Sequence, residues 1–377
     1  ITDTLGGILK DYEKNGEVYF NSCQYINSNS DWAQLLFSEL KDELIEFNHK
    51  YGSYTDIYGY EKISKTFAGI TLHTSNSFEI SDLPINSLSD RISIYPEEIG
   101  SPIKEWLQRM KIDPNIISPD GAIGLQLSKV FIDNNIEEIA KKKLESNIYD
   151  EIYGLPRNVI NLPVEKCFLP KNGYNKLFKK IENLLKDYGV KISYNSPVVP
   201  LWSGSKLSLK IKNNPEEAIK IIWTCNPTAL IKFYNKKKID SITVKMNVIV
   251  ADLDCNYVEP YYIQVYSKKI NITRIFIYQI GNKSKITIES FEEDRSNQEV
   301  ISFAQKILYK HDLNITIKVE AISKYQQKRY FLTSLHDKEI FNNFYKGTEE
   351  TNLICGKWDS YGRDEKIQYI NNQLNKI

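Results

Sequence analysis

Three short motifs in the sequence contain the glycines and polar residues with which a protein backbone can approach a bound phosphate or a flat ring. They are Gly6-Gly7, residues 168–174 (FLPKNGY) with the segments that follow them, and residues 353–364 (LICGKWDSYGRD). Glycine has no Cβ, so its N–H group can come close to a ligand. Each motif taken singly is better explained as an ordinary turn or helix–strand connection.

The second and third motifs lie where strands and helices are expected to meet. The second continues through residues 189–192 (GVKI), 197–199 (PVV) and 222–227 (IWTCNP). In the third, an expected strand ends at Gly356 and runs into the last helix. The first turn of that helix could present N–H groups and the positive end of the helix dipole to an anion.

Cysteines and histidines do not cluster as metal or triad chemistry requires. The five cysteines are scattered, with no CxxC spacing and no histidine at zinc-ligand spacing, so neither a disulfide framework nor a metal site is expected. The four histidines are isolated, which disfavours a Ser-His-Asp site. The cysteines are expected to be buried free thiols in a reducing compartment, and the protein to be cytoplasmic.

The composition is that of an ordinary globular protein. At about 150 residues per domain, 377 residues correspond to two or three units. No window approaches the roughly 18 apolar residues of a membrane helix, and no signal segment opens the sequence. With 49 Lys+Arg against 48 Asp+Glu, the net charge is +1. We therefore expect neither a membrane span nor dedicated nucleic-acid binding, although a local basic patch is not excluded.

Helical spacing is clearest in two segments. Residues 31–50 place apolar side chains on one face, with Asp31 as the N-cap, and predict an amphipathic helix. Residues 172–189 predict a second helix that ends at Gly189 and is followed at once by a strand at 190–192. Further helices are expected in an irregular helical layer over about 76–155: residues 101–111, 123–134 and 135–148.

Short β-rich runs fill much of the second half of the chain. A hairpin-like stretch at 207–218 precedes a strand at 218–223. Four later runs predict an antiparallel sheet: residues 242–252, 261–266, 272–279 and 284–290. A helix near 297–309, a strand near 314–320 and a closing helix from about 364 complete the pattern. No internal repeat or low-complexity linker is present, so interleaved domains are expected.

Taken in order, the motifs resemble the family of flavin-dependent amine oxidases, protoporphyrinogen-oxidase-like enzymes and UDP-galactopyranose mutases. The family pattern has an acidic residue on the second Rossmann strand, Gly-Gly six residues later, a P-x-G-G-x-x-x-L helix followed by G-V-x-I, a strand ending near T-x-P, and G-R-W before a C-terminal helix. The matching positions span nearly the whole chain: Gly6-Gly7, Pro170 with Gly173, 189–192, 224–227 and 356–358.

Two departures from the family pattern stand out. The family's GxGxxG loop and ribose-binding acid precede the Gly-Gly pair, whereas this sequence begins at Ile1, one position past the place of that acid. We expect an N-terminal unit of roughly 30 residues to be missing from this sequence and not lost from the protein, and this chain alone to bind FAD weakly or not at all. Lys357 stands in place of the family's Arg, which keeps the charge but loses the planar fork.

The resemblance implies an α/β fold with a Rossmann-type FAD-binding domain, its N-terminal unit missing, interleaved with an α+β substrate domain. Flavin would lie along the interface between the two domains. The FAD-binding domain would comprise residues 1–30, 160–240 and 345–377. The substrate domain, with a helical cap and an antiparallel β-sheet, would comprise residues 31–159 and 241–344.

The resemblance also implies noncovalently bound FAD, because no Cys or His lies in a recognisable attachment motif. The implied cofactor-binding residues are Gly6, Gly7, Val198, Val199, Thr224, Pro227, Gly356, Lys357 and Trp358. The candidate substrate-binding residues are Arg274, Tyr262 and Tyr266, on two runs of the expected sheet. A solvent-facing role for Arg274 fits its position equally well, and no catalytic residue can be assigned.

The implied function is that of an amine oxidase-like, FAD-dependent oxidoreductase, which transfers a hydride from a small-molecule or sugar-nucleotide substrate to the flavin. The alternatives are a mutase-like sugar-nucleotide isomerase with Arg274 as the diphosphate clamp, a flavin-less pseudoenzyme, and a nucleotide-sugar binding protein. We favour the oxidoreductase because the His-containing segment expected in mutases is here residues 21–25 (NSCQY). The substrate, the electron acceptor and the oligomeric state are not indicated.

Overall fold

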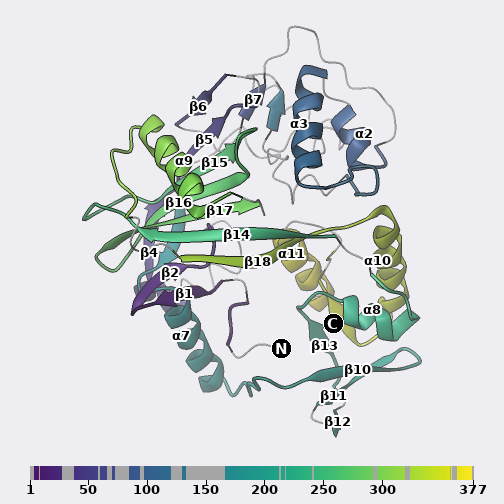
Figure 1. Ribbon diagram of the computed structural model, residues 1–377. Coiled ribbons are helices and arrows are strands. Elements are labelled where there is room, and N and C mark those ends of the chain that lie inside the picture. Colours follow the sequence, from purple (N-terminus) through teal and green to yellow (C-terminus); the bar gives the residue numbers. More distant parts are fainter. Residues whose placement is uncertain are drawn as a thin grey trace.

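Figure 1 presents the computed structural model from which the fold is described. The structure describes the following residues: 4–7, 9–27, 38–57, 60–65, 70–72, 85–93, 97–119, 130–132, 166–211, 214–216, 218–239, 242–291, 295–318, 323–356, 358 and 363–375. None of the helices formed by these residues is long and apolar enough to cross a membrane.

A seven-stranded sheet forms the centre of the molecule, in the order β18-β14-β17-β16-β15-β5-β6. Its strands are β5 (Lys50–Thr55), β6 (Lys62–Ser64), β14 (Ile242–Asp252), β15 (Tyr261–Tyr266), β16 (Ile272–Ile280), β17 (Lys283–Phe291) and β18 (Ser323–Leu332). All neighbours are antiparallel except β15 and β5, which run parallel. The four predicted β-rich runs are thus confirmed as β14 to β17, in a sheet that is larger and mixed.

The two faces of this sheet pack against different parts of the chain. Helix α9 (Asn297–Lys310) covers one face, where Ile249, Ile275 and Ile288 join Ala304 and Ile307 in a buried cluster. This helix begins with a capping box in which Ser296 and Glu299 satisfy each other's backbone N–H groups. Since side chains alternate along a strand, the neighbouring residues of the same strands face the opposite side.

The opposite face packs against a hairpin, a small sheet and a helix. The hairpin joins β1 (Asp11–Lys14) to β2 (Glu17–Phe20), and its turn has positive φ at Asn15 and Gly16, as a tight two-residue hairpin requires. The small sheet has the order β3-β9-β4, and helix α7 (Tyr174–Asp187) follows its middle strand. Its strands are β3 (Ile26–Asn27), β9 (Lys166–Pro170) and β4 (Leu44–Asn48).

The start of α7 is capped by a residue far away in the chain. Gly173 at the N-cap has a φ of +91° and supplies no side chain. Instead, the Asp11 carboxylate accepts the N–H groups of Tyr174 (2.9 Å) and Asn175 (2.8 Å). The first motif region is therefore tied to the beginning of the second through strand β1.

A third group of elements surrounds two short parallel strands, β13 (Ile221–Trp223) and β19 (Leu353–Cys355). It adds a three-stranded antiparallel sheet of β10 (Val198–Ser203), β11 (Lys206–Ile211) and β12 (Asn214–Glu216), with helices α8 (Thr228–Asn235), α10 (Leu335–Thr348) and α11 (Arg363–Leu374). The predicted hairpin after 207 and the closing helix are confirmed. In Figure 1 this group occupies the lower right, below the central sheet.

The remaining described elements lie at the top of Figure 1, beyond the central sheet. They are α2 (Leu88–Ser93), α3 (Glu97–Arg109), and the parallel pair β7 (Ile70–Leu72) and β8 (Val130–Ile132). The short 3-10 helix η1 (Lys41–Glu43) leads directly into β4. The predicted helix near 101–111 is confirmed as part of α3. Most of the predicted helices at 123–134 and 135–148 lie outside the described residues, but residues 130–132 are a strand and not a helix.

Besides residues 130–132, three sequence predictions were wrong in the described residues. Residues 44–50 of the predicted helix form β4 and the start of β5, because Leu44 and Phe47 pair with β9 and the chain then crosses into the large sheet. Residues 190–192 form no strand. Near 314–320, the described residues make only an isolated bridge from Ile317 to Leu253.

Candidate functional site

The carboxyl ends of β13 and β19 bring two of the predicted motifs together. Trp223 is opposite Cys355 in the parallel register. Thr224 and Gly356 therefore each follow the last residue of neighbouring parallel strands, at the same edge. In α/β proteins, ligands bind outside the carboxyl ends of parallel strands, so this edge is the candidate site that the topology itself indicates.

Tyr345 on α10 fixes the bend that follows β19. Its hydroxyl accepts the N–H of Trp358 (2.7 Å) and donates to the carbonyl of Gly356 (3.2 Å). One side chain thus determines the path of Gly356 and Trp358. Lys357, between them, lies outside the described residues.

Asn226 organises the bend that follows β13. Its Oδ1 accepts both the N–H (2.9 Å) and the hydroxyl (2.6 Å) of Thr228, at the start of α8. Pro227 occupies the N-cap position of α8 and is buried. The hydroxyl-bearing Thr224 is exposed beside this turn, so a ligand at the strand ends could reach it.

Asn352 joins the β10–β11 hairpin to the amino end of β19. Its side chain accepts the N–H of Leu207 (2.7 Å) and donates to the carbonyls of Leu207 (2.8 Å) and Ala218 (3.1 Å). The predicted cofactor-binding residues Val198 and Val199 lie on this hairpin, on β10. They are thereby linked to β13 and β19, although at the opposite end of those strands from Thr224 and Gly356.

The two glycines of the first motif have different surroundings. Gly6 has a φ of +103°, and a Cβ there would lie 2.6 Å from Phe178 and 2.7 Å from the Leu9 carbonyl. Packing against α7 therefore explains why residue 6 is a glycine. Gly7 has a φ of +57° and no atom within 4 Å of a built Cβ, so its backbone borders open space in which a ligand could lie. No hydrogen bond among the described residues joins either glycine to the β13–β19 edge.

The predicted substrate residues lie on the large sheet, on the face opposite α9. Tyr262 and Tyr266 are buried, and the Tyr262 hydroxyl donates to Gln264 Oε1 (2.8 Å). Arg274 pairs with the fully buried Glu289 at 3.4 Å, and its side chain is 12% exposed. Glu289 also accepts the N–H of Cys23 (2.8 Å). Arg274 is therefore held beside a counter-charge in the sheet and does not face bulk solvent.

An aromatic cluster around His49 was missed by the sequence analysis. The buried imidazole stacks on Tyr51 at 3.7 Å, meets Tyr25 edge-on at 4.0 Å, and lies 6.1 Å from the Tyr262 ring. The alternation of Phe47, His49 and Tyr51 was the available signal, because it is the spacing of one face of a strand.

The buried Lys285 was also missed. Its ammonium lies 2.9 Å from both Glu17 and Asp252 and 4.1 Å from the centre of the Tyr19 ring. These contacts tie the β1–β2 hairpin to β14 and β17. Burial and the neighbouring Asp252 raise the pKa of Tyr19 well above its usual range. In the described part of the chain, no three His, Cys, Asp or Glu residues are grouped to hold a metal.

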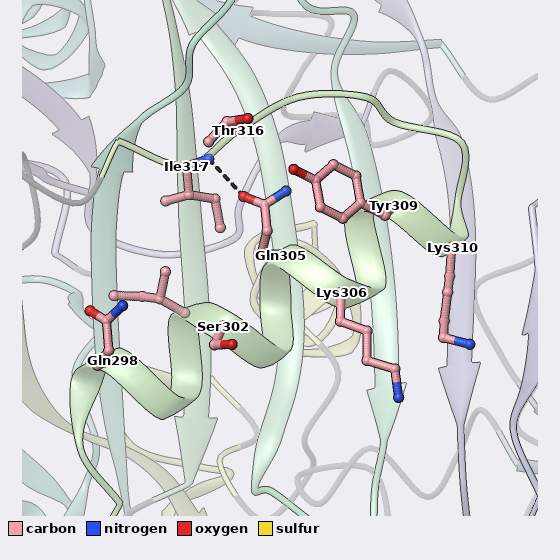
Figure 2. Close-up of a pocket in the computed structure, with 9 residues that line it drawn as sticks. Gln298, Ser302, Gln305, Lys306, Tyr309, Lys310, Thr316 and Ile317 are labelled. Atoms are coloured by element: carbon pink, nitrogen blue, oxygen red, sulfur yellow. Dashed lines mark hydrogen bonds between the residues drawn. The ribbon is translucent and has the colours of Figure 1, made fainter.

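A groove of about 580 Å³ lies on the other side of the sheet, along the outer surface of α9. Figure 2 shows Gln305 turned toward residues 316–317, where its Oε1 accepts the Ile317 N–H (2.8 Å). Lys306 and Lys310 point away from these residues in Figure 2, and both pair with Glu61. This groove is separated by the sheet from the predicted substrate residues.

Comparison with solved structures identifies enzymes of the same fold. A putrescine oxidase triple mutant matches with a TM-score of 0.55 and 12% identity, over 100% of this chain and 90% of that one. Cyclohexylamine oxidase from Brevibacterium oxydans IH-35A gives 0.56 at 9% identity, over 99% and 91%. A CLA-producing fatty acid isomerase from P. acnes gives 0.50 at 11% identity, over 100% and 91%. The chain is similar to these proteins in fold.

No family model matches the sequence, and no curated protein matches it. The structural likeness spans essentially the whole chain, as the sequence resemblance does. The mixed α/β fold that the resemblance to amine oxidases implies is thus confirmed at the level of the fold. The roles of the individual site residues remain predictions.

Proposed function

We propose that this protein is an FAD-dependent oxidoreductase that acts on a small molecule. The observation that carries the proposal is the parallel pairing of β13 with β19, which puts Thr224 and Gly356 at one edge in a chain whose fold resembles that of putrescine oxidase and cyclohexylamine oxidase. The FAD-binding part would comprise residues 1–30, 160–240 and 345–377, and the substrate part the remainder. FAD, when bound, supplies the acceptor for a hydride.

The residues at the strand ends are suited to one part of a dinucleotide. Backbone N–H groups at the carboxyl ends of parallel strands attract phosphate and ribityl oxygens. Tyr345 holds the Gly356–Trp358 bend in place, and Asn226 does the same for the bend before α8. Gly7, with open space beside its backbone, is the second proposed contact, and Val198 and Val199 are proposed to contact the adenine end.

The surroundings of Arg274 favour an oxidoreductase over a sugar-nucleotide mutase. A diphosphate carries at least two negative charges and needs cations whose charge is available to it. Arg274 already shares its charge with Glu289, which is fully buried beside it. This neutralised pair suits an uncharged or singly charged substrate better. Tyr262 and Tyr266 would then contribute an aromatic wall instead of a diphosphate clamp.

The proposal is tested with protein expressed from its complete gene. The expected result is a visible flavin spectrum that disappears from the polypeptide after acid precipitation, because the flavin is not covalently attached. Gly356→Val should abolish flavin retention while the far-ultraviolet circular dichroism spectrum is preserved, because a branched side chain would obstruct backbone approach. Ser193→Val is the control, since it adds a similar side chain at an exposed position.

Three results would count against the proposal. A colourless protein that takes up no FAD on reconstitution would identify a flavin-less protein. Full flavin retention by Gly356→Val would show that the β13–β19 edge does not hold the cofactor. A spectral response to UDP- or dTDP-sugars in a flavin-loaded sample would favour the mutase alternative.

A further inference from the structure

Arg91 is a buried arginine whose surroundings do not match its charge. It lies on the short helix α2 and is 3% exposed. Its Nη1 donates to the carbonyl of Pro119 at 3.3 Å, and its buried Nε has no acceptor. Within the part of the chain that the structure describes, no carboxylate pairs with this guanidinium.

A lone carbonyl is a poor partner for a buried guanidinium. Arginine stays protonated in proteins and presents five N–H donors in a planar fork. Burying such a cation without a counter-charge is strongly unfavourable. The buried ammonium of Lys285, by contrast, has two carboxylates at 2.9 Å. Arg91 has no such counter-charge among the described residues.

Ser118 adds a second buried donor, next in sequence to the residue that Arg91 contacts. It is fully buried, and its hydroxyl has no hydrogen-bond partner. Ser118 immediately precedes Pro119, the residue whose carbonyl receives the Arg91 bond. Its own N–H donates to the Thr333 carbonyl (2.9 Å), and the neighbouring Ile117 bridges to Ser334. The position of Ser118 between α2 and the start of α10 is thus fixed by the backbone.

We propose that Arg91 and Ser118 form a binding site for a small oxyanion, of the carboxylate or phosphate class. Both groups can donate hydrogen bonds, so the ligand that satisfies them together is an acceptor with negative charge. The planar fork of arginine matches the paired oxygens of such anions. Because both groups are shielded from bulk water, the ligand is small.

The site lies apart from the proposed flavin edge and does not depend on the proposed function. Its ligand would join helix α2 to the junction of β18 and α10 through residues 117–119, which already bond to Thr333 and Ser334. Binding would therefore stabilise the folded protein by mass action, with a size set by the anion concentration.

The test measures thermal unfolding in chloride buffer and after addition of inorganic phosphate or acetate at matched ionic strength. Wild-type protein should gain a saturable increase in Tm with at least one of them. A response to phosphate alone would identify a phosphate-type ligand, and a response to acetate alone a carboxylate. Arg91→Met should unfold at a higher temperature than wild type in chloride buffer, because it removes a buried charge that no carboxylate of the described residues pairs with, and should show no oxyanion response.

Three further variants sharpen the result. Ser118→Ala should weaken oxyanion binding by about 10- to 150-fold, which corresponds to one hydrogen bond to a charged group. Arg91→Lys should keep a weakened response, because it keeps the charge without the fork. Arg295→Met removes an exposed arginine and should respond as wild type does. Equal Tm values for wild type in chloride, phosphate and acetate, or an Arg91→Met variant less stable than wild type in chloride, would overturn the proposal.

Discussion

Replacing the buried Lys285 with methionine is expected to lower the free energy of unfolding by about 3 kcal/mol. Methionine fills a similar volume, so the change removes the charge with little loss of packing. The ammonium is 1% exposed and lies 2.9 Å from Glu17 and from Asp252. Without this ammonium, the Glu17 and Asp252 carboxylates have no shared cation between them where the β1–β2 hairpin packs on the large sheet.

The magnitude follows from the exposure of the three groups. Removing one member of a buried ion pair costs about 3–5 kcal/mol, because the other member is left buried without its partner. Here Glu17 and Asp252 are 28% and 23% exposed, so water can partly solvate them. Glu17 also keeps its contact with Lys283. These two features place the expected loss at the lower end of the range.

Urea unfolding followed by tryptophan fluorescence measures the effect, with the slope m compared between variants to check that the same surface is exposed. Lys283→Met is the matched control, because Lys283 contacts the same Glu17 from an exposed position and its loss should cost about 0–1 kcal/mol. Limited proteolysis at the β1–β2 turn should accelerate only in Lys285→Met. If the two variants lose equal stability, Lys285 does not hold the hairpin to the sheet and the reasoning fails.

Three other predictions concern ionisable groups. Hydrogen bonds from Lys306 and Lys310 lower the pKa of Glu61 to about 2. The free energy of unfolding should therefore fall as the pH drops from about 4.5 towards 2. Urea unfolding midpoints measure this effect, and those of Glu61→Gln should lack the pH dependence. Burial raises the pKa of Asp11 to about 6, so its effect on stability has the opposite sign. The free energy of unfolding should fall as the pH rises from about 4 to 6, and Asp11→Asn should lack this dependence. A wild-type stability that does not change over this pH range, or the same dependence in Asp11→Asn, would contradict the raised pKa of Asp11. Cys225 is exposed, whereas burial raises the pKa of Cys355 to about 12. A thiol reagent should therefore modify Cys225 in the native protein and Cys355 only after unfolding, as peptide mapping would show. Labelling of Cys355 in the native protein would refute this prediction.

The sequence predicted the fold best where local pattern and final environment agree. In strands β14 to β17, apolar residues alternate with polar ones or form continuous runs between clear turns, and α7 and α9 each have one apolar face. The period and length of the apolar pattern were therefore enough to predict these elements. The glycine-rich motifs located the β13–β19 edge, because a strand that ends in a glycine or in an Asn-Pro turn is visible without a partner. The likeness to amine oxidases in fold was accessible from the order of these motifs.

The failures come from interactions between distant residues. Residues 44–50 are compatible with both a helix and two strands, and pairing with β9 and β15, more than a hundred residues later, decided between them. No local rule indicates that Asp11 caps a helix at Tyr174, or that Arg274 lies against Glu289. Asn352 likewise bonds to Leu207 across the chain. Such contacts fix the candidate site, and a single sequence does not reveal them.

The parallel pairing of β5 with β15 has a consequence for synthesis on the ribosome. Residues 50–55 can pair early with β6, a few residues later in the chain, but their parallel partner is available only when residues 261–266 have emerged, which at about 5–20 residues per second takes roughly 10–40 s. During that interval Tyr54, fully buried in the finished protein, lacks the large sheet, and the edge of β5 that later meets β15 is open to association with other nascent chains. The yield of soluble protein should therefore depend on chaperones that bind the amino-terminal third of the chain, and slower translation should increase that dependence.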